Sequence, residues 1–257
     1  MKIKYKVKYL YYSFIANTIG NIYKNKNIHI LTYHEIVDSV KDEYSVSIKD
    51  FFNQMNYLKI NGYWTLKIKD VLNNSANIDI KKASIITFDD GYKSQINVAS
   101  KMLNEFGYSA IFFVTTRFIQ NGNNKYMSWS DIRELISRGF EVGLHSHNHN
   151  ILSRLSLEDL REDIKECKNI FERNTGFVPY MYALPYGKKN SFSDIIINEL
   201  KENGFTFIFT QINGPIVLKT DCYSIPRNNV PGYCSLKMYR DILNGKYDVF
   251  KYFLNSP

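Results

Sequence analysis

The chain has 257 residues, of which 44% are hydrophobic and 23% charged, with a net charge of +8. This composition is ordinary for a folded globular protein and excludes a disordered chain, and the length allows one large α/β domain. The Lys and Arg residues are scattered, and no basic stripe or motif supports nucleic-acid binding. The three cysteines, Cys167, Cys222 and Cys234, form no CxxC pair, which argues against a disulfide framework or a cysteine-built zinc site.

Residues 1–24 form a basic N-terminal segment that superficially resembles a secretory leader. However, Asn17 interrupts its apolar part and no small-residue cleavage site follows. Peripheral contact with an anionic membrane surface is one interpretation, and a plain first helix or strand is another of equal weight. We therefore expect a cytoplasmic or membrane-peripheral location rather than secretion, and we treat residues 25–257 as one domain.

Short apolar, β-branched or aromatic runs recur along this domain, and they predict parallel strands buried on both faces. Each run has about the length of a strand. They are IHILTY from Ile28, SIITF from Ser84, AIFFV from Ala110, EVGLH from Glu141, YMYAL from Tyr180, FTFIFT from Phe205 and YSIPR from Tyr223.

Amphipathic helices are predicted between these strands. The clearest one follows Ser156, where Ser156 and Asp159 resemble a capping box and apolar residues repeat at helical spacing until Gly176. The other predicted helices cover Lys49–Asn61, Ser94–Phe106, Ser130–Arg138, Ser191–Asn203 and Leu236–Leu243. Alternation of this kind predicts an α/β barrel or an open doubly wound sheet, in which chemistry collects at the carboxyl ends of the strands.

Histidines and carboxylates follow the predicted strands at these ends. The segment HSHNH places His145 and His149 four residues apart, a spacing that puts two imidazoles on one face of a helical turn. That spacing also occurs on solvated helix faces. Asp90 supplies a third ligand, and two histidines with one carboxylate leave positions open for water and substrate, as in catalytic metal sites.

The adjacent carboxylates Asp89 and Asp90 raise a separate question, because like charges repel. At a strand end followed by Gly91 the backbone can bend, so both side chains can approach one site from different directions. A cation would remove their mutual repulsion, with one carboxylate as ligand and the other as proton acceptor. A solvated Asp-Asp-Gly turn is the alternative interpretation.

The motifs TFDDGY, HSHNH and LPYG together resemble the polysaccharide deacetylase family, also called the NodB-homology or carbohydrate esterase family four domain. The resemblance covers at least Ser84–Gly187, and ILTYHEI extends it upstream to about Ile28, where it is similar to the branches that deacetylate poly-N-acetylglucosamine and related surface glycans. It implies a distorted (β/α) barrel of about seven parallel strands. It also implies a hydrolase that removes N-acetyl groups from amino sugars of a surface polysaccharide or its precursor.

The same resemblance implies the roles of the site residues. Asp89 would be the general base, and Asp90, His145 and His149 would bind a divalent metal, most often Zn²⁺, with Ni²⁺, Co²⁺ or Fe²⁺ as alternatives. The family places an oxyanion-binding backbone N–H in the PYG turn, which makes Tyr186 the candidate here. A metal-bound water would attack the acetamide.

Two departures from the family pattern affect these assignments. Many members carry an arginine where this chain has Ala183, and we hypothesise that Arg227 replaces it in orienting the base. Many also carry a catalytic-acid histidine near the C-terminus, but no histidine follows His149. In the surface-glycan branches that this chain resembles, a histidine in a YH motif near the N-terminus takes that place, and the resemblance therefore implies His34 as the candidate general acid.

The remaining histidines and aromatic residues receive structural interpretations. We expect His147 to point away from the ligand set, His29 to be a satisfied core residue, and Trp129 to pack rather than line a sugar subsite. Two other functions stay open, namely a metal amidohydrolase acting on a non-sugar amide and an inactive glycan-binding relative. The oligomeric state and the particular glycan are not readable from the sequence.

Overall fold

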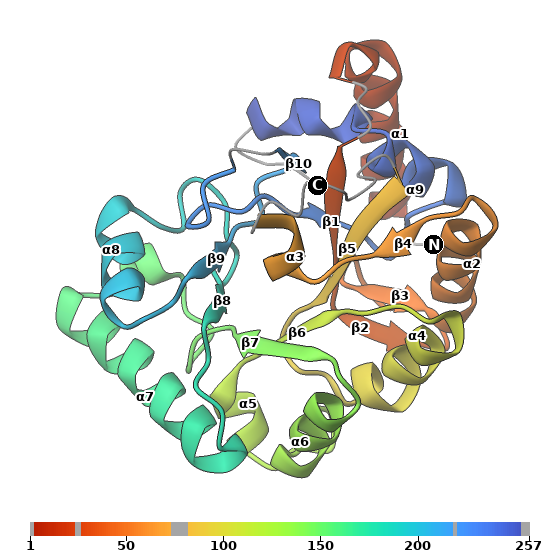
Figure 1. The fold of residues 1–257 in the computed structure, drawn as a ribbon. Helices are drawn as coiled ribbons and strands as arrows, with labels where there is room; N and C mark the ends of the chain where they lie inside the picture. Colours follow the sequence, from red (N-terminus) through yellow and green to blue (C-terminus); the bar gives the residue numbers. More distant parts are fainter. Residues whose placement is uncertain (1–2, 24–26, 73–81, 218–219, 253–257) are drawn as a thin grey trace.

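The computed structural model describes residues 3–23, 27–72, 82–217 and 220–252. A central, largely parallel sheet curls around an axis, and helices surround it (Figure 1). Its nine strands are β1 (Ile28–Tyr33), β4 (Trp64–Thr65), β5 (Ala83–Phe88), β6 (Ile111–Val114), β7 (Glu141–Leu144), β8 (Met181–Ala183), β9 (Phe207–Phe209), β10 (Pro215–Ile216) and β11 (Asn228–Asn229).

The order along the sheet is β10-β1-β5-β6-β7-β8-β9, with β4 paired to β5 and β11 paired to β1. Every described pairing in it is parallel except that of β10 with β1. A separate parallel pair consists of β2 (Glu35–Val37) and β3 (Ser45–Ser47). The expected (β/α) barrel architecture is therefore confirmed.

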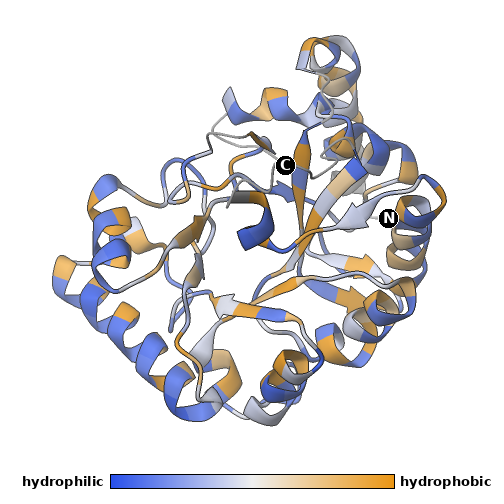
Figure 2. Cartoon of the chain, viewed as in Figure 1, coloured by the Kyte–Doolittle hydropathy of each residue, from blue (hydrophilic) through white to orange (hydrophobic). Residues whose placement is uncertain are grey.

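Most of the helices cover the outside of the sheet, with their hydrophilic faces turned to solvent (Figure 2). The α-helices are α1 (Ile3–Thr18), α2 (Ile48–Ile60), α3 (Ile68–Leu72), α4 (Ser100–Phe106), α5 (Thr116–Gln120), α6 (Trp129–Ser137), α7 (Leu157–Thr175), α8 (Asp194–Glu202) and α9 (Leu236–Leu243). Shorter helical segments are η1 (Gly20–Tyr23), the π-helix η3 (Gln95–Ala99), η4 (Leu152–Arg154) and η5 (Lys246–Tyr252). Among the described residues, no helix is both long and apolar enough to cross a bilayer.

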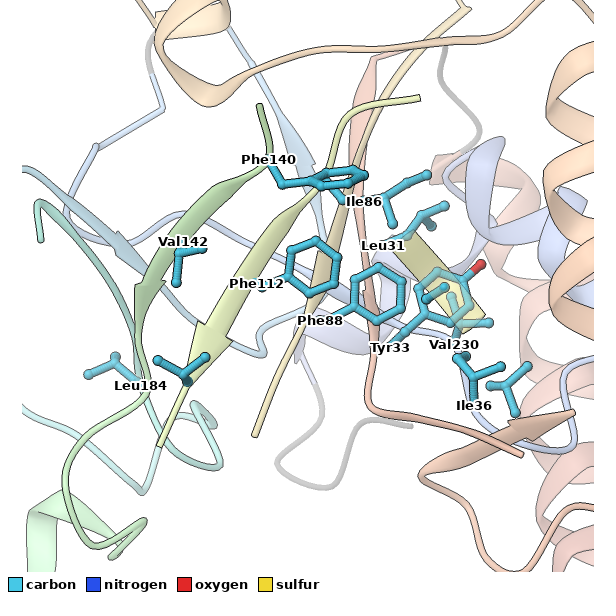
Figure 3. Close-up of a cluster of buried hydrophobic side chains, with 14 of the residues drawn as sticks. Leu31, Tyr33, Ile36, Ile86, Phe88, Phe112, Phe140, Val142, Leu184 and Val230 are labelled. Atoms are coloured by element: carbon cyan, nitrogen blue, oxygen red, sulfur yellow. The ribbon is translucent and has the colours of Figure 1, made fainter. Parts of the chain in front are cut away.

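Side chains that alternate along each strand fill two separate cores. On β5, Ile85 belongs to the cluster inside the curled sheet, whereas Ile86 and Phe88 belong to the cluster between the sheet and the helices. Figure 3 shows this second cluster, in which Phe112 stacks on Phe88 at 4.9 Å between ring centroids. Burial on both faces explains why the strands are continuous apolar runs.

One predicted strand is wrong in its extent. The segment Tyr223–Arg227 makes only a single bridge, between Ile225 and Phe209 of β9. The Ile225 N–H donates to the Ile208 carbonyl of β9, but the Arg227 N–H donates to the Ile212 carbonyl beyond the end of β9, so regular pairing stops after Ile225. After Arg227 the chain pairs with β1 through β11, so this segment connects β9 to β1.

The helix predicted over Ser94–Phe106 is also modified. After two α-helical residues, Lys93 and Ser94, it continues as the π-helix η3 and returns to α-helix at Ser100. The other predicted helices agree with the structure to within about three residues, a normal uncertainty at helix ends. For the basic N-terminal segment, the structure contains a helix, α1.

Replacing Phe112 with Ala should lower the free energy of unfolding by about 3–5 kcal/mol, because it empties a fully buried position between the rings of Phe88 and Phe140. Chemical denaturation measures this change. Phe177→Ala is the control, since the Phe177 side chain is 55% exposed and its loss should change the value by less than about 0.5 kcal/mol. Equal losses in the two variants would contradict this assignment of the core.

Candidate active site

The predicted site residues follow different strands of the sheet. His34 comes directly after β1, Asp89 and Asp90 after β5, and His145 after β7. Because these strands are parallel, their carboxyl ends lie at the same rim of the barrel. The structure brings His34, Asp89, Asp90, His145, His149 and Tyr186 together in the lining of one cavity of about 300 Å³.

Backbone strain is concentrated at this rim. In the described part of the chain, the non-glycine residues with positive φ are Asp90 (74°), Ser146 (64°), His149 (58°) and Tyr186 (62°). Each such conformation costs free energy that the surrounding structure must offset, and strained residues cluster at functional sites. The left-handed turn at Asp90, continued at Gly91 with φ 82°, lets the two neighbouring carboxylates face the same cavity.

The histidine motif is a loop, and the predicted helical turn is wrong. The left-handed conformation of Ser146 interrupts a helix immediately after His145. The Ser146 hydroxyl accepts a hydrogen bond from the His149 N–H at 2.7 Å and closes the loop. The loop still brings the two imidazoles together, because the centroids of the His145 and His149 rings lie 5.0 Å apart.

Asp90, His145 and His149 form a group that fits a divalent metal ion. One ligand atom from each residue lies within 4.8 Å of the others. Asp90 Oδ1 is 3.2 Å from His149 Nε2 and 3.6 Å from His145 Nε2, and it is buried without a well-directed hydrogen bond from any described residue. A buried carboxylate oxygen in that position is stabilised by a cation, so the donor set suits a metal.

The protonation state of His145 also suits a ligand. Its Nδ1 lies 2.8 Å from the carbonyl oxygen of Ala183 on β8, and this contact requires the proton to be on Nδ1. Nε2 then presents its lone pair to Asp90. Burial lowers the pKa of His145 to about 4, so the ring is neutral at neutral pH. Burial lowers the pKa of His149 as well, but Asp90 raises it more strongly, to a net value above the usual one.

Arg227 holds the other carboxylate, Asp89, inside the barrel. Its Nη1 donates to Asp89 Oδ1 at 2.7 Å and its Nη2 donates to Asp89 Oδ2 at 2.8 Å, while Nε donates to the Thr210 carbonyl at 3.0 Å. Both side chains are essentially fully buried. Burial alone raises the pKa of Asp89, but Arg227 and His145 more than compensate, so the pKa lies below its usual range. Asp89 is therefore a carboxylate at neutral pH.

Gln95 is a site residue that the sequence reasoning missed. Its side-chain amide donates to the Asp89 carbonyl at 2.6 Å and to the His34 carbonyl at 3.1 Å, so it joins the loops after β5 and β1. The π-helix η3 begins at this residue, and π-helical turns frequently occur at functional sites. A glutamine early in a predicted helix gives no signal in a sequence.

Further residues complete the cavity lining. Gln211 Nε2 lies 3.4 Å from Asp89 Oδ2, and the ring of Tyr44 packs against the edge of His34 at 5.1 Å. The ring of Tyr186 lies 5.2 Å from that of His149 and its side chain is half exposed. The lining therefore combines charged groups with aromatic rings, as ligand-binding pockets commonly do.

The other histidines take the structural positions that we expected. His147 turns away from the ligand set, with Nδ1 at 2.8 Å from Thr116 Oγ1 and Nε2 at 3.5 Å from Glu166. His29 is buried and lies 3.2 Å from Asp248. Trp129 packs against Phe171. A larger cavity of about 560 Å³ beside His147 contains neither Asp89 nor Asp90, so the smaller cavity is the candidate active site.

The fold and this site define a class of protein, the α/β barrels in which two histidines and one carboxylate that could hold a metal ion meet at the carboxyl ends of the strands. Comparison with known proteins is more specific. The family model for polysaccharide deacetylase matches residues 77–208, which is just over half of the chain. The chain belongs to the polysaccharide deacetylase family.

Individual relatives support the same membership. YxkH of Bacillus subtilis is 27% identical over 169 residues, covering 65% of this chain and 59% of YxkH. The poly-β-1,6-N-acetyl-D-glucosamine N-deacetylase of Staphylococcus aureus MSSA476 is 24% identical over 235 residues, covering 86% of this chain and 80% of the relative. The chain spans less than two thirds of YxkH and of several other curated relatives.

Solved structures agree on the fold. The deacetylase PplD of Streptococcus pyogenes superimposes with a TM-score of 0.74 at 21% identity, covering 84% of this chain and 97% of PplD. At this level of identity the match supports the barrel architecture alone.

Asp90→Ala and His149→Ala should each abolish stoichiometric binding of zinc, because two ligands rarely hold the ion. Elemental analysis after dialysis measures the bound metal. His147→Gln is the matched control from the same loop, and it should retain the ion because its ring points into the other cavity. Retention of zinc by Asp90→Ala would refute the ligand set.

Arg227→Met should lower the free energy of unfolding by about 3–5 kcal/mol, because it leaves the Asp89 carboxylate buried without its partner. The double variant Arg227→Met/Asp89→Asn should recover part of that loss, since the uncompensated charge is gone. Denaturation of the single variants and the double variant measures the coupling. Strict additivity would mean that the two side chains do not stabilise each other.

Proposed function

We propose that this protein is a metal-dependent deacetylase that removes N-acetyl groups from amino sugars of a surface polysaccharide or its precursor. The observation that carries the proposal is the convergence of the Asp90, His145 and His149 ligand atoms beside the ion-paired Asp89 in one cavity. The similarity to a poly-β-1,6-N-acetyl-D-glucosamine N-deacetylase over 86% of the chain supports this class of substrate.

The proposed metal is a divalent ion, most often zinc, held by Asp90, His145 and His149. When bound, it would supply Lewis-acid chemistry, polarising the acetamide carbonyl and lowering the pKa of a water molecule at an open position. His145 fits this role because its tautomer is fixed by Ala183. Asp90 fits because it is ionised. Burial raises its pKa, but the nearby histidines lower the pKa by more, to a net value below the usual range.

Asp89 is proposed as the general base. It is ionised, it lies 3.8 Å from His145 Nε2, and Arg227 fixes the plane of its carboxylate. It can therefore accept a proton from an attacking water molecule near the ligand set, and a positioned base of this kind contributes about 10²–10⁴ in rate. Arg227 is a positioning residue, since it acts through Asp89.

His34 is proposed as the general acid that protonates the departing amine. It lines the same cavity as Asp89. It follows β1, whereas Asp89 follows the neighbouring strand β5, and its backbone carbonyl accepts a hydrogen bond from Gln95. The backbone N–H of Tyr186, in the strained turn before Gly187, is proposed to bind the developing oxyanion. The products would be acetate and a free amino sugar.

The test is release of acetate from N-acetylglucosamine oligomers by the wild-type protein. Asp89→Asn and His34→Ala should each lower kcat by about 10²–10⁴, and a chelator should remove activity that added zinc restores. His147→Gln should keep the wild-type rate. Full activity of His34→Ala would refute its assignment as the acid, even with the rest of the proposal intact.

Two other results would favour the competing functions. Equal rates on a simple non-sugar acetamide and on the oligomers would favour a general amidohydrolase. Binding of the oligomers without any release of acetate, in protein that carries its full complement of zinc, would favour an inactive glycan-binding relative.

A further inference from the structure

Helix α1 carries apolar side chains on two faces, and the protein covers only one of them. On the covered face, Tyr12 and Ala16 are buried, and the ring of Tyr12 meets that of Phe250 edge to face at 5.0 Å. Near the end of the helix, Lys237 donates a hydrogen bond to the Asn17 side chain at 3.0 Å. These contacts attach α1 to α9 and η5, at the edge of the barrel (Figure 1).

The other face is an exposed apolar stripe, which we call the α1 stripe and define as Val7, Leu10, Tyr11 and Phe14. These residues are 55–68% exposed. Their spacing of three, one and three residues places them on one side of a helix. Ile22, 81% exposed, follows in η1. Single exposed apolar residues are normal on a protein surface, but a continuous row of large ones indicates a surface that another partner covers.

The charge of the same segment identifies the kind of partner. The first 34 residues contain six lysines and no Asp or Glu, and four of the lysines, at positions 2, 4, 6 and 8, fall within the first eight residues. A segment of net positive charge that carries an exposed apolar helical face complements a bilayer with anionic headgroups, because the apolar side chains can enter the acyl boundary while the positive charge is attracted to the phosphates. A tyrosine in the stripe suits this interface.

We propose that α1 docks the protein on the surface of an anionic lipid bilayer through the α1 stripe. The helix lies along the surface, because its opposite face stays packed on the protein through Tyr12 and Ala16. A second copy of this chain would also cover apolar residues, but two lysine-rich helices would repel each other across a symmetric contact.

Docking in this way places the active-site cavity beside the lipid. Lys8, the neighbour of Val7, forms an ion pair with Glu43 and lines the cavity together with His34 and Asp90. The substrate would therefore be reached where it lies close to the membrane surface. The docking itself does not depend on the proposed function.

The experiment is flotation of the full 257-residue protein with vesicles, without substrate. Vesicles of neutral phosphatidylcholine are compared with vesicles that contain about 25% phosphatidylglycerol, at about 0.1 M and about 0.5 M salt. The wild-type protein should bind the anionic vesicles at low salt and should bind at least about tenfold less in the other conditions. The variant Leu10→Glu/Phe14→Glu should bind the anionic vesicles at low salt at least about tenfold more weakly than the wild-type protein does.

The matched control is Val178→Glu/Ile195→Glu, which adds the same charges at positions of similar exposure away from α1. It should bind the anionic vesicles like the wild type, and circular dichroism should show that both double variants fold. Equal binding to both kinds of vesicle, no binding to either, or the same loss in both variants would overturn the proposal. The proposal would also be overturned if the wild-type protein did not bind vesicles and instead formed a stable dimer that the Leu10→Glu/Phe14→Glu substitutions dissociate.

Discussion

The buried ion pair between Arg227 and Asp89 is the interaction on which the site depends. Taking both charges out of water costs several kcal/mol per ion, and the bidentate geometry with further hydrogen bonds to Thr210 and Thr87 offsets that cost. The guanidinium occupies the interior of the barrel above the Phe113 ring. It therefore links the end of β5 to the segment that follows β9, and it fixes the proposed base and the barrel wall at the same time.

Short contiguous motifs explain how much of the site could be predicted. Asp89 and Asp90 are neighbours, and His145 and His149 share one loop, so their residue types and spacing are visible in the sequence. The hypothesis for Arg227 rests on two features of the sequence. Many family members carry an arginine where this chain has Ala183, and Arg227 stands at the end of an apolar run. The structure places that arginine on Asp89.

The contacts that could not be predicted act through position rather than residue type. The Ala183 carbonyl orients His145 as any residue's carbonyl could, and Gln95 is an ordinary helix residue whose amide happens to reach two loops. The strand predicted over Tyr223–Arg227 failed because the Arg227 N–H donates to the Ile212 carbonyl beyond β9, and the helical turn failed because Ser146 is left-handed. The side chains of Ser146 and Tyr186 carry no signature of their positive φ.

The two hydrogen bonds of Gln95 have a consequence for how the site can change. Its single amide holds the loop of His34 and the loop of Asp89 at once, so neither loop can shift without the other. The distance between the proposed proton donor, His34, and the proposed base, Asp89, is thereby constrained from outside the cavity. Tyr44 lies at the exposed edge of that cavity and makes neither of these hydrogen bonds, so its side chain can be exchanged without moving the two loops.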